Sequence, residues 1–327
     1  MKLKNLAISL ALFALATVPA RAQVPRGTIT IVVPYGPGGA TDLVARVVAE
    51  GMSKKLGNTV IVENKPGAFG ITAMEYVKAA DADGRTLLMQ NVTTGGLTPL
   101  LYAKKMSFDP MKEFKPVTRI AQFDGVFVAS KASHPAFTSF KEMITWAKKN
   151  PGKLRVGNVG KNSIPHLDAM KLAKEAGIKA NHIPATSGGA GMVADLINGD
   201  LHVAGLNVAS AKSLVQSGKG VALIAAAPKR LAAFPDVPTE AELGYTGVGS
   251  GNWQAIFVRK GVPDAVVNTL NDAIRAAVMS KTATTALTNA NADIILSKDP
   301  AEVSAWLDKE ISGLKSDIAS LGIQASK

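Results

Sequence analysis

The stretch Tyr35-Gly36-Pro37-Gly38-Gly39-Ala40-Thr41-Asp42 decides the fold expected for this 327-residue chain. An apolar run at 28–33 precedes it, and apolar side chains recur at helical spacing from Leu43 to Leu56 after it. This pattern predicts a strand, a glycine-rich turn and an amphipathic helix. The first N–H groups of a helix have no partner within it and carry partial positive charge. We therefore expect the turn to bind an anion through backbone N–H groups. Glycine lets a ligand approach the backbone closely and allows the positive φ angles of a nest of N–H groups.

The first 22 residues are typical of an export signal. Lys2 and Lys4 form a positive segment, 6–18 is apolar, and Ala20-Arg21-Ala22 is a small-residue cleavage site. The apolar run is shorter than the roughly 20 residues that a membrane anchor needs. The chain contains no cysteine, which excludes a lipid-attachment cysteine, a disulfide and a thiolate metal site. We expect cleavage after Ala22 and a product in the periplasm without a lipid anchor.

The remaining 305 residues (327 minus 22) are more than one hydrophobic core usually serves, so two lobes are expected. Loss of Lys2, Lys4 and Arg21 lowers the formal net charge from +12 to +9. The cations are scattered in pairs along the sequence, and aromatic residues make up only 5% of it. No nucleic-acid-binding motif is present, so we expect no nucleic-acid partner.

Strand and helix patterns alternate along the chain and start again near Gln122, which indicates an α/β fold with two similar lobes. The expected strands lie at 28–33, 59–62, 86–90, 125–130, 153–157, 181–184, 201–206, 221–225 and 251–258. The expected helices lie at 43–56, 74–79, 140–148, 167–176 and 193–197, and most of 264–279 and 300–321 is helical. A second polar turn, 159–166, opens the helix at 167–176. Residues 23–121 form the first segment of lobe 1 and 122–250 form lobe 2. Residues 251–327 add a return strand and C-terminal helices that complete lobe 1 and pack across the hinge. Ligands of such sheets bind beyond the carboxyl ends of the strands.

Five motifs in order resemble those of the tripartite tricarboxylate transporter substrate-binding proteins, also called Bug proteins. They are 33–42 with Arg46 following, 62–68, Asp83-Gly84, 163–167 and 234–239. The resemblance implies a two-lobe periplasmic binding protein of the type II topology, with the ligand cleft between lobes joined by crossing strands. It also implies closure on a small carboxylate, delivery to a membrane permease, no cofactor and a monomeric state.

The resemblance also gives the ligand-binding residues. They are Tyr35, Gly38, Gly39, Thr41 and Asp42 in lobe 1, and Asn162, Ser163, His166, Thr186, Ser187 and Gly188 in lobe 2. Thr41 and Ser163 are alternatively helix N-caps, because these residue types often fill that position. Asp42 alternatively caps its helix, holds a water or pairs with a ligand amine. His166 is alternatively a structural hydrogen-bonding residue. Trp253 is expected to pack inside the protein, and stacking on an aromatic ligand is the alternative for this residue.

The hypothesis that the protein is an enzyme has less support in the sequence. The first turn lacks the ending of a P-loop and the spacing of a dinucleotide fingerprint. The four histidines show no close metal-ligand pair, and no Gly-x-Ser-x-Gly elbow is present. We expect no catalytic residue, metal or cofactor. The runner-up is a secreted hydrolase that uses Ser163 and His166, which share one turn but have no evident orienting acid. The third hypothesis is a chemosensory binding protein.

Overall fold

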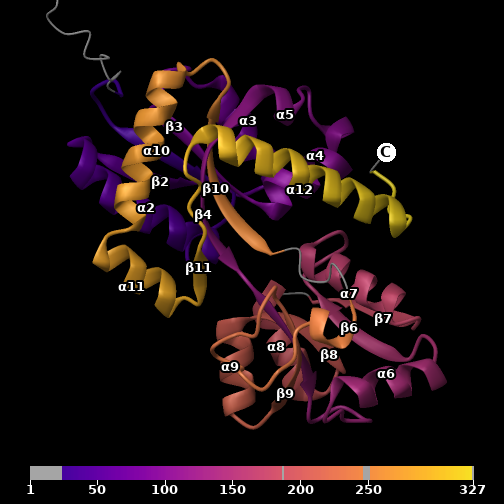
Figure 1. The fold of residues 1–327 in the computed structure, drawn as a ribbon. Coiled ribbons are helices and arrows are strands. Elements are labelled where there is room, and N and C mark those ends of the chain that lie inside the picture. The colour runs from indigo at the N-terminus through magenta and orange to yellow at the C-terminus, as the bar shows by residue number, and fades with distance from the viewer. Residues whose placement is uncertain (1–23, 186–187, 246–250, 326–327) are drawn as a thin grey trace, which may run out of the picture.

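The computed structural model describes residues 24–185, 188–245 and 251–325, which fold around two β-sheets (Figure 1). The strand order of the first sheet is β11 (Ala292–Ile294), β4 (Phe114–Phe123), β10 (Asn252–Arg259), β3 (Thr86–Asn91), β1 (Ile29–Val33) and β2 (Val60–Asn64). The order of the second is β7 (Ala180–Pro184), β6 (Leu154–Asn158), β8 (Val203–Asn207), β5 (Gly125–Ser130) and β9 (Gly220–Ala226). We refer to the parts built on these sheets as lobe 1 and lobe 2.

Lobe 1 is a sheet with helices on both faces, and its central strands are buried on both sides. β1 pairs in parallel with β2 and β3, whereas β10 runs antiparallel to β3 and β4. The side chains of β1 alternate between two cores: Ile31 and Val33 belong to one, and Val32 belongs to the other. A strand that is buried on both faces is apolar throughout, which explains why the sequence pattern located β1 so closely.

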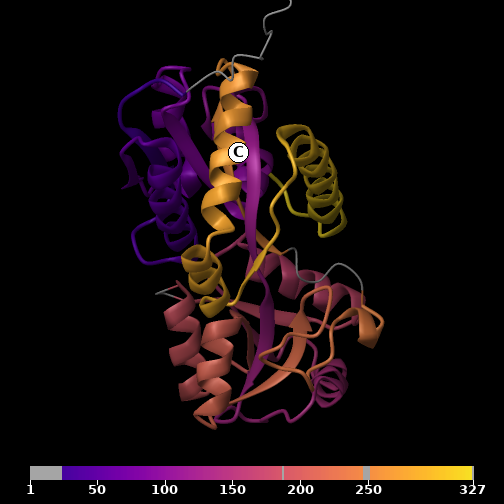
Figure 2. The same ribbon diagram turned by 60° about the vertical axis from the view of Figure 1, so that its left-hand side comes forward.

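The helices of lobe 1 divide between the two faces of this sheet (Figures 1 and 2). α2 (Ala40–Leu56) and α10 (Asp264–Val278) share the core of one face, with α11 (Lys281–Asn289) beside them. α3 (Ile71–Ala79), the short helix α4 (Thr98–Leu101) and α12 (Pro300–Ser320) contribute to the core of the other, and α5 (Pro110–Glu113) precedes β4. α2 and α10 approach so closely that a Cβ atom on Gly51 would lie 2.4 Å from the Cβ of Ala277.

Lobe 2 repeats the layered arrangement with a smaller sheet. β6 pairs in parallel with β7 and β8, and β5 lies antiparallel between β8 and β9. Its helices are α6 (Phe140–Lys149), α7 (Ile164–Glu175), α8 (Gly188–Asn198) and α9 (Val208–Gln216). α7 follows β6 and α8 follows β7, so both helices begin at the carboxyl ends of parallel strands. Ligand sites in open α/β sheets lie at these ends.

The chain passes from one sheet to the other at Asp124, because β4 ends at Phe123 and β5 begins at Gly125. The sequence pattern predicts this change near residue 122. The lobes also touch through α12 and α7: Lys171 Nζ lies 2.7 Å from Asp317 Oδ2, and Lys174 Nζ donates to the carbonyl of Ser320 at 2.7 Å. The helix that carries the second predicted turn is therefore fixed against lobe 1 at its far end.

Neither a membrane span nor a multi-ligand metal cluster is present in 24–185, 188–245 and 251–325. No helix there combines the length and the apolar character needed to cross a bilayer. No group of three or more His, Cys, Asp or Glu residues there is placed to hold a metal ion.

Candidate functional site

The glycine-rich turn of lobe 1 begins α2 and faces open space. Gly39 is the N-cap residue of α2, with φ −83° and ψ 173°. Of the three glycines in the turn, Gly38 alone has a positive φ, +93°. A Cβ atom on any of the three would meet nothing within 4 Å. The turn is therefore accessible to a ligand.

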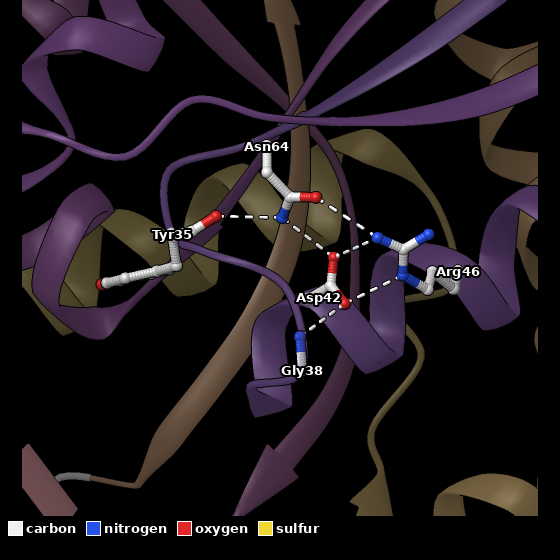
Figure 3. A network of polar contacts seen from close by, with 5 residues as sticks. All are labelled: Tyr35, Gly38, Asp42, Arg46 and Asn64. Carbon is white, nitrogen blue, oxygen red and sulfur yellow. Dashed lines mark hydrogen bonds and ion pairs between the residues drawn. The ribbon is translucent and has the colours of Figure 1, made fainter.

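Asp42 is held by groups of the protein itself (Figure 3). Its Oδ2 accepts hydrogen bonds from the N–H of Gly38 and from Arg46 Nε, both at 2.9 Å. Its Oδ1 accepts from Asn64 Nδ2 at 2.9 Å and from Arg46 Nη2 at 3.0 Å. Asn64 Nδ2 also donates to the carbonyl oxygen of Tyr35 at 2.9 Å, which ties β2 to the turn.

The same network sets the charge state of Asp42. Burial of this side chain raises its pKa, but the hydrogen bonds from Arg46, Gly38 and Asn64 outweigh burial and lower the pKa to about 2. Asp42 is thus an anion at neutral pH whose two oxygens are occupied by neighbouring donors. Asp42 is the third residue of α2 and not its N-cap, and its hydrogen bonds favour a role in shaping the turn over contact with a ligand carboxylate.

Asn91 joins the other polar residues of lobe 1. Tyr35 Oη donates to Asn91 Oδ1 at 3.0 Å, and Asn91 Nδ2 donates to Thr41 Oγ1 at 3.3 Å. Asn91 Oδ1 also accepts from the N–H groups of Thr93 and Thr94, the second and third residues of the π-helical turn η2 (Val92–Leu97). Thr41 is the second residue of α2 and not its N-cap, so that alternative is wrong. The sequence argument missed Asn91, although its position at the carboxyl end of β3 would have indicated it.

The second predicted turn carries buried polar atoms without partners. Ser163 is the N-cap residue of α7, but its side chain makes no capping hydrogen bond. Among the described residues, its buried Oγ has no hydrogen-bond partner, and neither has Oδ1 of Asn162, which is 8% exposed. Asn162 has a φ of +64°, a conformation that asparagine tolerates better than most residues. Buried polar atoms are normally hydrogen-bonded, so these two indicate a binding site.

His166 supports this turn. Its Nδ1 accepts the N–H of Asn162 at 3.1 Å, which places the imidazole proton on Nε2. Burial lowers the pKa of His166 and the charge of Lys161 lowers it further, so the ring is neutral. The unpartnered Ser163 hydroxyl is not hydrogen-bonded to His166, and the nucleophile and base of the hydrolase alternative are therefore not assembled.

A cavity of about 270 Å³ lies where the lobes meet. It is lined by the link between β4 and β5 and by the first turns of α7 and α8. Thr93 of η2, Asn207 at the end of β8 and Asn252 at the start of β10 complete the wall. Of the predicted site residues in the described part of the chain, only Ser163 lines it, and the Tyr35–Asp42 turn does not. Gly188 begins α8, while Thr186 and Ser187 lie outside the described residues.

The indole of Trp253 packs inside the protein. It is 1% exposed, its Nε1 donates to Glu310 Oε1 at 3.1 Å, and its ring meets that of Trp306 edge-on at 5.2 Å. A packing role for this residue therefore fits the geometry better than stacking on a ligand.

A family model described as the tripartite tricarboxylate transporter family receptor matches residues 44–313. The chain belongs to this family. A UPF0065 protein of Bordetella pertussis is 37% identical over 253 residues, which cover 77% of each chain. Two solved structures share 28% identity with this chain: R. palustris Rpa4515 with adipate, at a TM-score of 0.79, and MatC (Rpa3494) from Rhodopseudomonas palustris with bound malate, at 0.75. They cover 92% and 90% of this chain, respectively, and the match covers 99% of each of theirs.

Membership confirms the resemblance seen in the sequence motifs and the two-lobe α/β binding-protein fold. The chain is a periplasmic solute-binding receptor of the tripartite tricarboxylate transporter type, and its family is one of receptors rather than enzymes. The first 23 residues, which contain the expected export signal, lie outside the described part of the receptor.

Proposed function

We propose that this receptor captures a small organic carboxylate between its lobes and delivers it to a tripartite tricarboxylate-type membrane permease. The observation that carries the proposal is Ser163, whose buried hydroxyl lines the cavity, stands at the start of α7 and has no partner in the described chain. A carboxylate there would accept hydrogen bonds from the hydroxyl and from the free N–H groups of the helix, and it would interact favourably with the helix dipole. The adipate and malate in the two related structures are ligands of this chemical class.

The turn of lobe 1 supplies the second half of the proposed site. The Tyr35–Asp42 turn faces open space and lies outside the cavity wall, so it reaches the ligand only when the lobes close. The lobes of a clamshell receptor close by rotating about the connection between them, which lies here at Asp124. Tyr35 and Thr41 then act through Asn91, which holds η2 and its cavity residue Thr93. We further propose processing after Ala22 and function as a monomer.

The first test replaces the hydroxyl in the cavity. A thermal-shift screen of di-, tri-, amino- and aromatic carboxylates identifies the ligand, because an acid at 100 times its Kd adds about 2.7 kcal/mol of stability. Ser163→Ala should then weaken binding of that acid about tenfold by calorimetry, because it removes a hydrogen bond to a charged group. Its stability should stay near that of the native protein, because the hydroxyl has no partner to lose.

Ser139→Ala is the matched control. Ser139 is also an N-cap serine of lobe 2, but its side chain accepts the N–H of Glu142 at 3.2 Å. Its replacement should cost about 1 kcal/mol of stability and leave the Kd unchanged. Equal affinity of Ser163→Ala and the native receptor would place the carboxylate elsewhere.

The second test addresses lobe 1. Gly39→Val is compatible with folding, because Gly39 has a negative φ and open space at its Cβ position. In the closed receptor the branched side chain would cover the N–H groups at the start of α2, so affinity should fall at least about tenfold, the equivalent of one charged hydrogen bond. Native affinity in a folded Gly39→Val variant would mean that the turn does not reach the ligand.

A further inference from the structure

The charges around the cavity are unusual for a site that binds an anion. Among its described lining residues there is no lysine, arginine or histidine, but there are two aspartates, Asp124 and Asp168. Much of the remaining wall is apolar, including Phe123, Phe127 and Met192. A ligand with two or three carboxylates would bring further negative charge next to these two aspartates.

One carboxylate oxygen of Asp124, in this wall, accepts no hydrogen bond from the described residues. The residue is 5% exposed, and its Oδ1 accepts from Gln122 Nε2 at 2.9 Å. Its Oδ2 is buried and has no hydrogen-bond partner in the described part of the chain. Burial raises the pKa of Asp124 and the charge of Asp293 on β11 adds to this, while Gln122 and Lys229 act in the opposite direction. A buried carboxylate gains most from a partner that brings its own positive charge.

Asp168 places a second carboxylate at a short distance from the proposed anion site. It is 7% exposed and lies on α7, five residues after Ser163, which corresponds to about 7.5 Å along a helix axis. Lys171 of the same helix is paired with Asp317 of α12 at 2.7 Å. The cavity therefore has hydrogen-bond donors at the start of α7, and its wall also contains two carboxylates and several apolar side chains.

We propose that the ligand is an amino-carboxylate with an apolar body, whose carboxylate lies at Ser163 and whose ammonium group binds Asp124, with Asp168 contributing negative charge. This inference rests on the proposed function, because it assumes that the cavity is the carboxylate site. An ammonium group is favoured over a metal ion, because the described residues contain no cluster of three or more metal-binding side chains.

The test compares acids that differ only at one end. Hexanoate, 6-aminohexanoate and adipate share one carbon chain and carry a methyl, an ammonium and a carboxylate group at the far end. Phenylalanine and 3-phenylpropanoate form a second pair with the amine beside the carboxylate. By calorimetry at pH 7.5, at least one amine should bind about tenfold more tightly than its matched acid, the value of one charge-assisted hydrogen bond. Adipate should bind more weakly than 6-aminohexanoate.

The Asp124→Asn variant tests whether the preference for the amine depends on Asp124. This variant should lose most of the tenfold preference for the amine while it retains affinity for the simple acid. Asp293→Asn is the control, because it removes the neighbouring exposed carboxylate, which does not line the cavity. It should keep the preference.

The outcomes separate this inference from the proposed function. Equal or tighter binding of both simple acids to the native receptor would overturn the inference and leave carboxylate capture intact, whether or not Asp124→Asn folds. A folded Asp124→Asn variant that keeps the full preference would also overturn it. Failure of every acid and amino acid to bind would count against the proposed function itself.

Discussion

Gly51→Ala should lower the free energy of unfolding by about 2 to 3 kcal/mol, the usual range for overpacking of a tight core. Alanine normally stabilises a helix relative to glycine, but here the new methyl group would lie 2.4 Å from Ala277 Cβ and 2.6 Å from Ala277 Cα. The second contact is with backbone, so α2 and α10 would have to separate. Urea unfolding followed by circular dichroism measures the change.

Gly313→Ala is the matched control for this prediction. Gly313 also lies inside a helix, α12, but a Cβ atom there would meet nothing within 4 Å. Its replacement should stabilise the receptor by about 0.5 to 1 kcal/mol. If Gly51→Ala were stabilising too, α2 and α10 would not be in the close contact described.

Asp42→Asn should cost about 2 kcal/mol of stability at pH 7 and make stability less dependent on pH in acid. The pKa of Asp42 falls from 3.8 to about 2 in the folded receptor, where the residue is 2% exposed. A depressed pKa stabilises the native state above the unfolded pKa, near 4, and this contribution is lost as the pH falls through 2. Stability curves from pH 7 down to 2 should therefore converge for the native and variant receptors.

Glu50→Gln tests whether any ion pair of α2 would behave in this way. Glu50 pairs with Lys54 at 2.7 Å, but both side chains are exposed, and such pairs contribute little. Glu50→Gln should change the free energy of unfolding by less than about 0.5 kcal/mol. Parallel curves for Asp42→Asn and the native receptor across the acid range would show that the network around Asp42 does not depress its pKa.

The elements that the sequence predicted well are those whose pattern depends on burial. The strand expected at 125–130 coincides with β5, and those at 28–33 and 86–90 differ from β1 and β3 by one residue at one end. β4 was missed, because Lys115, Pro116 and Arg119 interrupt its apolar character. Long strands near the edge of a sheet tolerate such residues, so periodicity alone does not identify them.

Besides the four-residue helices α4 and α5, two longer helices escaped prediction, for a different reason. α9 and α11 are rich in alanine, serine and threonine, and each buries only a few small or medium side chains, such as Ala211 in α9 and Ala283 in α11. Few buried apolar positions therefore mark either helix in the sequence. Both helices are stabilised by tertiary packing, which a local reading of the sequence does not contain.

The candidate site was predictable in its location and less so in its detail. Both predicted turns begin helices, at Gly39 and Ser163. Which hydroxyl is free was not predictable, because Thr41 is engaged by Asn91, fifty residues away, while Ser163 has no described partner. The carboxylate of Asp124 in the cavity was missed for the same reason: its environment is created by residues from several elements of both lobes.

The pair of contacting indoles on β10 and α12 gives this receptor an intrinsic fluorescent probe. The sequence contains three tryptophans, and two of them, Trp253 and Trp306, are in contact in lobe 1. Trp253 directly follows Asn252, which lines the cavity, whereas Trp146 packs against Phe137 in lobe 2. Movement of β10 during ligand capture would therefore change the emission of the pair, so that uptake of a colourless acid is followed by intrinsic fluorescence without a label.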